Sequence, residues 1–281
     1  MEQTNISNHI RRFPNILDFF VMSAWVFAAQ IISVSLCRLC GLEFPDATLL
    51  DSADDRISLA TQLTMAQSLA VIYPISMLLS LGGILLYRKV RGGISKIASF
   101  SVSGFDPSRL LGLFVLMVAM QVVIEPLTMM MPDTPQMVGR GFFTILVSVV
   151  FAPIFEEIIC RGIVLESFRE RYNVWVGWIC SSLFFGVIHG QVTAMFNASM
   201  LGLILGYAYI RSNSIFSVVI LHALNNGLAL ALMAFNLGDS TFREIMPTPQ
   251  IYWSVWAVSF VALAIGFAIM VRNMRRMTLK R

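Results

Sequence analysis

The sequence predicts an all-α polytopic membrane protein, a bundle of about eight transmembrane helices that form one integral-membrane domain over residues 1–281. Three observations predict this class. Of the residues, 57% are hydrophobic and only 13% are charged, whereas a soluble domain carries about 25% charged residues. Apolar runs near the ~20 residues that a bilayer-spanning helix needs recur along the chain. We expect spans at 16–36, 64–87, 110–131, 141–165, 174–190, 195–210, 214–236 and 250–271.

The distribution of charge gives these spans an orientation. Cytoplasmic loops of membrane proteins are enriched in Lys and Arg. If the N-terminus is inside, the cytoplasmic segments receive most of the basic residues, from Arg11 and Arg12 to the tail 272–281. The opposite loops receive few basic residues, together with an acidic run at Glu43, Asp46, Asp51, Asp54 and Asp55. We expect both termini in the cytoplasm. The net charge is +4, but the basic residues lie at the ends of the spans, where loops meet lipid headgroups, which argues against nucleic acid as the partner.

Ionisable and amide side chains gather in the predicted spans beyond residue 140. Charged groups inside a membrane are costly and usually functional. At a rise of ~1.5 Å per residue, those on the fourth, fifth and seventh spans lie about 12–22 Å from the cytoplasmic ends. We therefore expect these residues to line one intramembrane cavity, with a catalytic core at about 141–236. The polar residues of these spans are Glu156, Glu157, Arg161, His189, Asn197, His222, Asn225 and Asn226. Glu125, beside Pro126, reaches a similar depth, and a structural role and a pathway role are equally open for it.

The helical spacing of these residues predicts how they pair. Glu157 and Arg161 are four residues apart and share a helix face, so we expect a buried ion pair. Glu156 points about 100° away and is left free as a candidate general base. On the seventh span, His222 and Asn226 share a face and offer two donors toward one point, as an oxyanion needs. His189 is expected to hold a water beside Glu156, with Phe185 one turn away.

Several known catalytic patterns are missing from the sequence. There is no H-E-x-x-H zinc-protease motif, no serine nucleophile elbow within a span and no pair of membrane aspartates. A different class of function remains open at this stage: a transporter, or a scaffold that uses buried charges to bind a partner. No inverted repeat typical of secondary transporters is present.

Three motifs resemble a known family of membrane enzymes. The stretch "EEIICRG", beginning at Glu156, is similar to the E-E-x-x-x-R motif of the CPBP family, the CAAX-processing and bacteriocin-processing (Abi) intramembrane endopeptidases. "FGVIH", from Phe185 to His189, resembles that family's F-x-x-x-H motif. "HALNN", from His222 to Asn226, resembles its H-x-x-x-N/D motif. The motifs occur in the family's order on successive membrane segments. Cys160 departs from the pattern, because an aromatic residue commonly precedes the arginine.

The resemblance implies a conical cavity and a set of roles. Glu156 and His189 would activate water, His222 and Asn226 would stabilise the oxyanion, and Glu157 with Arg161 would support them. It also implies a membrane-associated peptide or protein substrate, of the CAAX type or of the bacteriocin or leader-peptide type. Short connectors and Met-rich spans resemble the bacterial members, which favours a bacterial cytoplasmic membrane. No metal is favoured as cofactor; if zinc is used, its ligands would be Glu156, His189 and His222.

Overall fold

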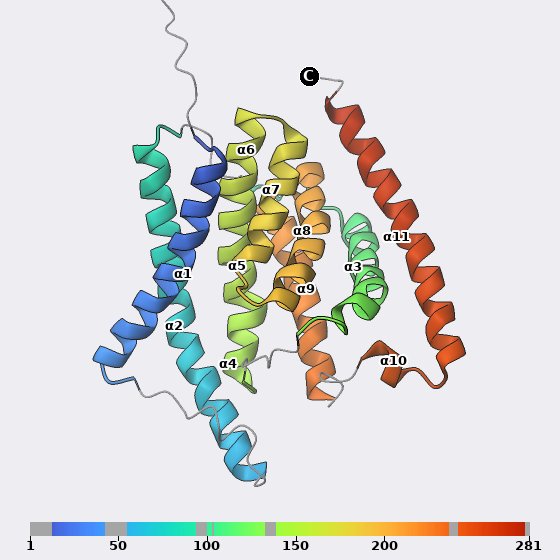
Figure 1. Ribbon diagram of the computed structural model, residues 1–281, viewed down its shortest axis with the longest axis horizontal. Helices are drawn as coiled ribbons and strands as arrows, with labels where there is room; N and C mark the ends of the chain where they lie inside the picture. Colours follow the sequence, from blue (N-terminus) through green and yellow to red (C-terminus); the bar gives the residue numbers. More distant parts are fainter. Residues whose placement is uncertain are drawn as a thin grey trace, which may run out of the picture.

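The chain folds into helices throughout the part that can be described. The computed structural model describes residues 13–42, 55–93, 100–102, 104–132, 139–235 and 241–278, and no strand occurs in these ranges (Figure 1). The prediction of an all-α fold is confirmed. Within these ranges, seven helical stretches are long and apolar enough to cross a membrane. They are α1 (Ile16–Leu39), α2 (Asp55–Val90, with the apolar part from Ser58), α3 (Pro107–Thr128), the stretch Phe142–Arg171, α8 (Val192–Ser212), α9 (Ile215–Ala234) and α11 (Pro249–Thr278).

The predicted fifth span is shorter than expected. α7 covers Val174–Val187, 14 residues, fewer than the ~20 that span the hydrocarbon core. The chain turns directly after it, where Gly190 has a φ of +75° that glycine adopts at little cost. The described residues therefore contain seven long helices and one short apolar helix, where the sequence predicted about eight spans.

α7 and α8 pack closely because small residues line their interface. A Cβ atom on Gly202 would lie 3.0 Å from the Cα atom of Ser182, and one on Gly206 would lie 2.8 Å from Cδ1 of Trp178. These glycines and Ala198 recur every fourth residue, and such small-xxx-small spacing lets two helix backbones approach. The Gly202 carbonyl accepts a hydrogen bond from Arg161, which lies on the neighbouring stretch Phe142–Arg171.

The stretch Phe142–Arg171 alternates between α-helical and π-helical segments. It runs through α4 (Phe142–Ile145), η2 (Leu146–Phe151), α5 (Ala152–Glu157), η3 (Ile158–Leu165) and α6 (Glu166–Arg171). In η2 the Ala152 amide donates to the Val147 carbonyl, five residues back. Pro153 follows and has no amide hydrogen to donate. The Ser148 carbonyl therefore loses its ladder partner. Such π-bulges occur frequently at functional sites.

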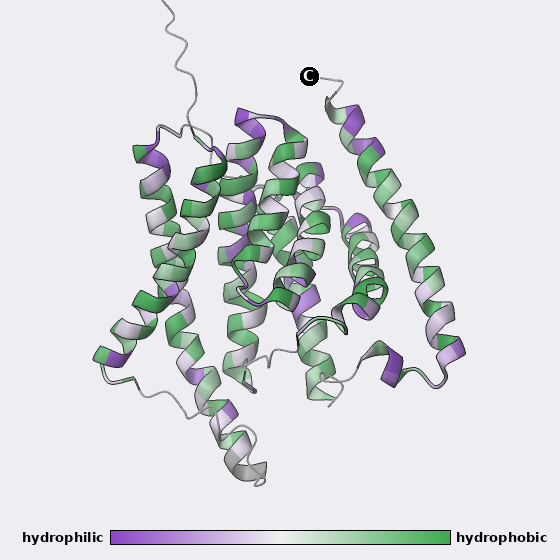
Figure 2. Cartoon of the chain, in the orientation of Figure 1, coloured by the Kyte–Doolittle hydropathy of each residue, from purple (hydrophilic) through white to green (hydrophobic). Residues whose placement is uncertain are grey.

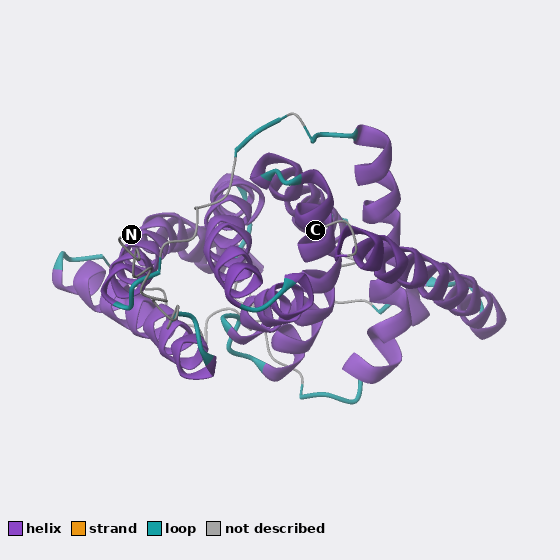
Figure 3. Ribbon diagram, turned by 90° about the horizontal axis from the view of Figure 1, so that it is seen from above, coloured by secondary structure: helices purple, strands orange, loops and turns teal. Residues whose placement is uncertain are grey.

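The remaining helices flank this central group on two sides. α1 packs against α2 on one side, and α3 packs against α11 on the other, as Figures 1 and 3 show. α10 (Phe242–Ile245) precedes α11. α1 begins and α11 ends at the same side of the bundle (Figure 1). Hydrophilic residues concentrate toward the helix ends (Figure 2). The acidic residues 43–54 and the arginines at 11 and 12 lie outside the described residues.

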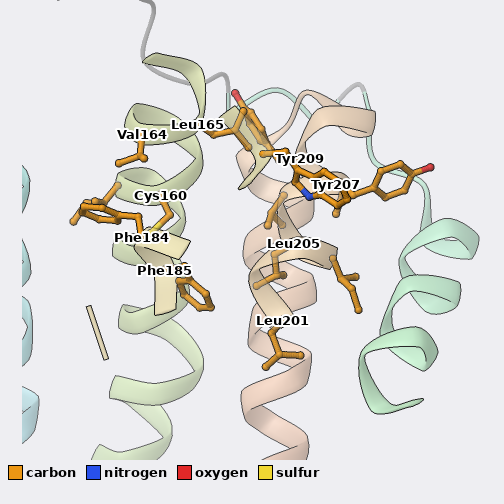
Figure 4. Close-up of a cluster of buried hydrophobic side chains, with 14 of the residues drawn as sticks. Cys160, Val164, Leu165, Phe184, Phe185, Leu201, Leu205, Tyr207 and Tyr209 are labelled. Atoms are coloured by element: carbon orange, nitrogen blue, oxygen red, sulfur yellow. The ribbon is translucent and has the colours of Figure 1, made fainter. Parts of the chain in front are cut away.

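One hydrophobic core joins the central helices and holds the polar site in place. Figure 4 shows side chains of η3 (Cys160, Val164 and Leu165) beside those of α7 (Phe184 and Phe185), with α8 side chains nearby. All five of these residues are buried. Burial of such side chains fixes the rotation of each helix about its axis, and this rotation decides which polar groups meet. The four cysteines are all free.

Candidate active site

A fully buried ion pair lies at the centre of the site. Arg161 Nη1 is 2.9 Å from Glu157 Oε1, and both side chains have zero exposed area. Arg161 Nη2 donates to the Gly202 carbonyl at 3.0 Å, and the guanidinium lies 4.7 Å from the centroid of the Phe185 ring. A buried charge is tolerated only when it is paired and hydrogen-bonded. The expected pairing of Glu157 with Arg161 is therefore present in the structure.

Glu157 has a second partner that its spacing from Arg161 did not predict. His222 Nδ1, on α9, is 2.8 Å from the same Glu157 Oε1. A carboxylate only accepts hydrogen bonds, so Nδ1 of His222 carries the hydrogen of this contact. A carboxylate that fixes the tautomer and orientation of a histidine in this way is common in hydrolase sites. Glu157 therefore neutralises Arg161 and orients His222 at the same time.

Glu156 lies between His222 and a tyrosine from α2. The Tyr73 hydroxyl donates to Glu156 Oε1 at 2.7 Å. His222 Nε2 is 3.8 Å from Glu156 Oε2, which is longer than a hydrogen bond. Glu156 is buried, with 7% of its surface exposed. Tyr73 could not be predicted from the sequence, because no helical spacing connects it with Glu156; the signal that the sequence offers is a hydroxyl beside Pro74 in an apolar span.

His189 lies at the end of α7 and is tied to its own helix. Its backbone amide donates to the Gly186 carbonyl at 2.9 Å instead of to the Phe185 carbonyl. The Phe185 carbonyl oxygen is contacted by the His189 side chain, whose Nδ1 lies 2.7 Å away. Helix ends leave such carbonyls without backbone partners. His189 is exposed, and no hydrogen bond or ion pair joins it to Glu156 within the described part of the chain. The nearest polar partners of Glu156 are thus Tyr73 and His222.

Phe185 is the contact between the two histidines. Its ring centroid is 5.0 Å from that of His189 and 5.4 Å from that of His222, both in edge-to-face geometry. The same ring faces the Arg161 guanidinium. Phe185 therefore brings the three motifs into one cluster and covers the buried ion pair with apolar surface.

Asn226 satisfies the carbonyl that the π-bulge leaves free. Its Nδ2 donates to the Ser148 carbonyl at 2.8 Å, the group that lost its ladder partner at Pro153. Asn225 Nδ2 contacts Asn226 Oδ1 at 3.3 Å. An amide nitrogen has two hydrogens, so one hydrogen of Asn226 remains for a ligand. His222 and Asn226 share a face as expected, yet the structure gives Asn226 a backbone-capping contact of its own.

Glu125 lies away from this cluster and anchors the α10 end of the molecule. It accepts a hydrogen bond from the Phe242 amide at the first position of α10, and Trp256 of α11 donates to the nearby Val123 carbonyl at 3.1 Å. A carboxylate at a helix N-terminus satisfies free amides and favours the helix dipole. Of the two roles left open for Glu125, these contacts support the structural one.

The donors of the site do not form a group suited to a metal ion. Across the described residues, no three His, Cys, Asp or Glu side chains gather in a way that could hold one. His222 Nδ1 bonds to Glu157 and His189 Nδ1 lies against a backbone carbonyl, contacts that histidines with and without a metal make. Glu156, His189 and His222, the expected ligands if zinc is used, are not gathered as such a group in the structure.

The central segment of the chain is similar to known proteins. Residues 139–228 match the family model described as type II CAAX prenyl endopeptidase Rce1-like. Two curated proteins are similar: an Escherichia coli protein named "Uncharacterized 24.3 kDa protein", 33% identical over 117 residues, and a Bacillus subtilis (strain 168) protein named "Putative membrane peptidase YdiL", 29% identical over 82 residues. The matches cover 40% and 29% of this chain and 53% and 34% of these relatives.

The family model covers the residues that carry the three motifs, from Glu156 to Asn226. The chain spans about half the length of the Escherichia coli relative and a third of that of the Bacillus subtilis relative. No solved structure matches the chain. The chain is an integral membrane protein, and over residues 139–228 it is similar to Rce1-like CAAX prenyl endopeptidases, in agreement with the three motifs of the sequence.

Proposed function

We propose that the protein is an intramembrane endopeptidase that hydrolyses a peptide bond of a membrane-associated peptide or protein. The observation that carries the proposal is His222, which bonds to Glu157 through Nδ1 and faces Glu156 through Nε2. A carboxylate, a histidine and a carboxylate that orients the histidine form an acid–base arrangement typical of hydrolases. The family match over residues 139–228 supports the same activity.

In the proposed mechanism, Glu156 acts as the general base through Oε2. It takes a proton from water, and the hydroxide attacks the carbonyl carbon of the scissile bond. His222, protonated on Nε2 and held by the charge of Glu157, stabilises the developing oxyanion together with the second hydrogen of Asn226. Proton return from Glu156 to the leaving amine completes hydrolysis. His189, whose Nε2 is free of its helix contact, binds the water or the substrate at the mouth of the site.

We further propose that the reaction needs no metal; in support, no three His, Cys, Asp or Glu side chains of the described residues gather in a way that could hold one. The substrate belongs to the CAAX type or to the bacteriocin or leader-peptide type, and the protein resides in a bacterial cytoplasmic membrane with both termini in the cytoplasm. The start of α1 and the end of α11 at one side of the bundle (Figure 1) support this topology.

The proposal is tested with two quenched fluorescent peptides and the full chain in liposomes. One peptide ends in a farnesylated cysteine followed by three residues, and the other is an unprenylated leader-type peptide. We expect wild type to cleave one of them and His222→Ala to lose at least about 100-fold, the loss typical of a general acid–base or oxyanion group. Equal rates for the two proteins on both peptides would contradict the proposal.

A further inference from the structure

We propose that Tyr73 is a positioning residue that selects which oxygen of Glu156 acts on water, an inference that rests on the proposed function. Tyr73 lies on α2, outside the segment 139–228 that matches the family model. Its hydroxyl donates to Glu156 Oε1 at 2.7 Å. The candidate site is therefore completed by a helix that precedes the matched segment.

The two oxygens of Glu156 are made different by this contact. The terminal torsion of a glutamate is broad and roughly two-fold, so a carboxylate without partners can exchange its two oxygens. The hydroxyl of Tyr73 occupies Oε1, and Oε2 is left opposite His222 Nε2 at 3.8 Å. A hydrogen bond from a hydroxyl to an ionised carboxylate is of the strong, short kind. The bond from Tyr73 therefore keeps Oε2 directed toward His222, where the proposed attack of water takes place.

The other groups around Glu156 do not duplicate this contact. From α9, His222 directs its Nδ1 hydrogen to Glu157. Farther along α2, the hydroxyls of Ser76 and Ser80 donate to carbonyls of their own helix. On its own helix, Arg161 directs its terminal nitrogens to Glu157 and the Gly202 carbonyl, and the Cys160 thiol is only a weak donor. Tyr73 is thus the neutral donor bonded to Glu156 among the described residues.

The chain offers a matched control for the loss of this hydroxyl. Tyr209 on α8 donates to Glu166 Oε1 at 2.8 Å, and its side chain is buried. This second tyrosine–glutamate bond joins the same helical stretch, Phe142–Arg171, to a neighbouring helix, yet it lies outside the candidate site. Tyr73→Phe and Tyr209→Phe each remove one oxygen atom and one hydrogen bond to a glutamate. Only the first change affects Glu156.

The experiment uses the full chain in detergent and has two readouts. The first is the infrared carboxylate band of Glu156, identified as the band that Glu156→Gln removes. The second is kcat and KM on whichever of the two fluorescent peptides wild type cleaves. We expect Tyr73→Phe to shift the band and to lower kcat by about tenfold or more with KM unchanged, as loss of an orienting partner does. Tyr209→Phe should change neither, while both variants lose similar thermal stability.

Each outcome decides the inference separately from the proposed function. An unshifted Glu156 band in Tyr73→Phe, or an equal loss of kcat in Tyr209→Phe, overturns the positioning role. Wild-type activity in Glu156→Gln overturns the proposed function, and the infrared band still reports whether Tyr73 binds Glu156. A Tyr73→Phe protein with a raised KM and unchanged kcat also counts against the inference, because it would place Tyr73 in substrate binding.

Discussion

Replacing Arg161 by methionine tests whether the buried ion pair stabilises the site. Methionine fills most of the volume and removes the charge. The Arg161 side chain has no exposed area and loses three contacts, to Glu157 at 2.9 Å, to the Gly202 carbonyl at 3.0 Å and to the Phe185 ring at 4.7 Å. Breaking a buried ion pair by removing one partner costs about 3–5 kcal/mol, because the other charge remains buried without compensation.

This magnitude converts into a measurable change in melting temperature. For a chain of this size, a destabilisation of 1 kcal/mol lowers Tm by about 2–4 °C, so Arg161→Met should lower Tm by roughly 10 °C. The assay is thermal unfolding of the purified protein in one detergent, followed by tryptophan fluorescence.

The double variant Glu157→Gln/Arg161→Met provides the control. It removes both charges, and a glutamine oxygen still accepts from His222 Nδ1, so we expect it to recover more than half of the lost Tm. A Tm for Arg161→Met within about 2 °C of wild type would refute the reasoning. So would a double variant as unstable as the single one, since the loss would then not come from an uncompensated charge.

Three further predictions concern the surroundings of the site. Asn226→Ala leaves the Ser148 carbonyl without a donor and should cost about 1–3 kcal/mol of stability, measured as a lower Tm; an unchanged Tm would leave Asn226 without its capping role. Gly202→Val places a Cβ atom 3.0 Å from the Cα atom of Ser182 and should cost about 1–3 kcal/mol by separating α7 from α8. The control Gly227→Val, where a Cβ atom meets nothing within 4 Å, should cost less. Prolonged treatment with a metal chelator should leave the cleavage rate unchanged, and a loss that added zinc restores would contradict the metal-free mechanism.

The sequence predicted the interactions that depend on spacing within one helix. Glu157 and Arg161, four residues apart, form the expected pair. The close packing of α8 against α7 also follows from a spacing within one helix, that of the small residues of α8. Both follow from the geometry of a helix, which the sequence alone supplies.

Contacts between helices could not be predicted in the same way. Tyr73 meets Glu156 across 83 positions of sequence, and no periodicity reports the distance between two helices. Glu157 contacts His222 as well as Arg161, and this second contact depends on the orientation of α9 about its axis in the bundle. The π-helical segment η2 is a local departure from the α-helical ladder, which an apolar pattern does not reveal.

The most direct test of the account is single-turnover cleavage by Glu156→Gln, with Glu166→Gln as its control. Both glutamates lie on the stretch Phe142–Arg171 and each accepts a tyrosine hydroxyl, but only Glu156 faces His222. The account predicts that Glu166→Gln cleaves the peptide like wild type and that Glu156→Gln loses at least about 1,000-fold, within the range of general-base catalysis. Cleavage by Glu156→Gln at the wild-type rate would contradict it.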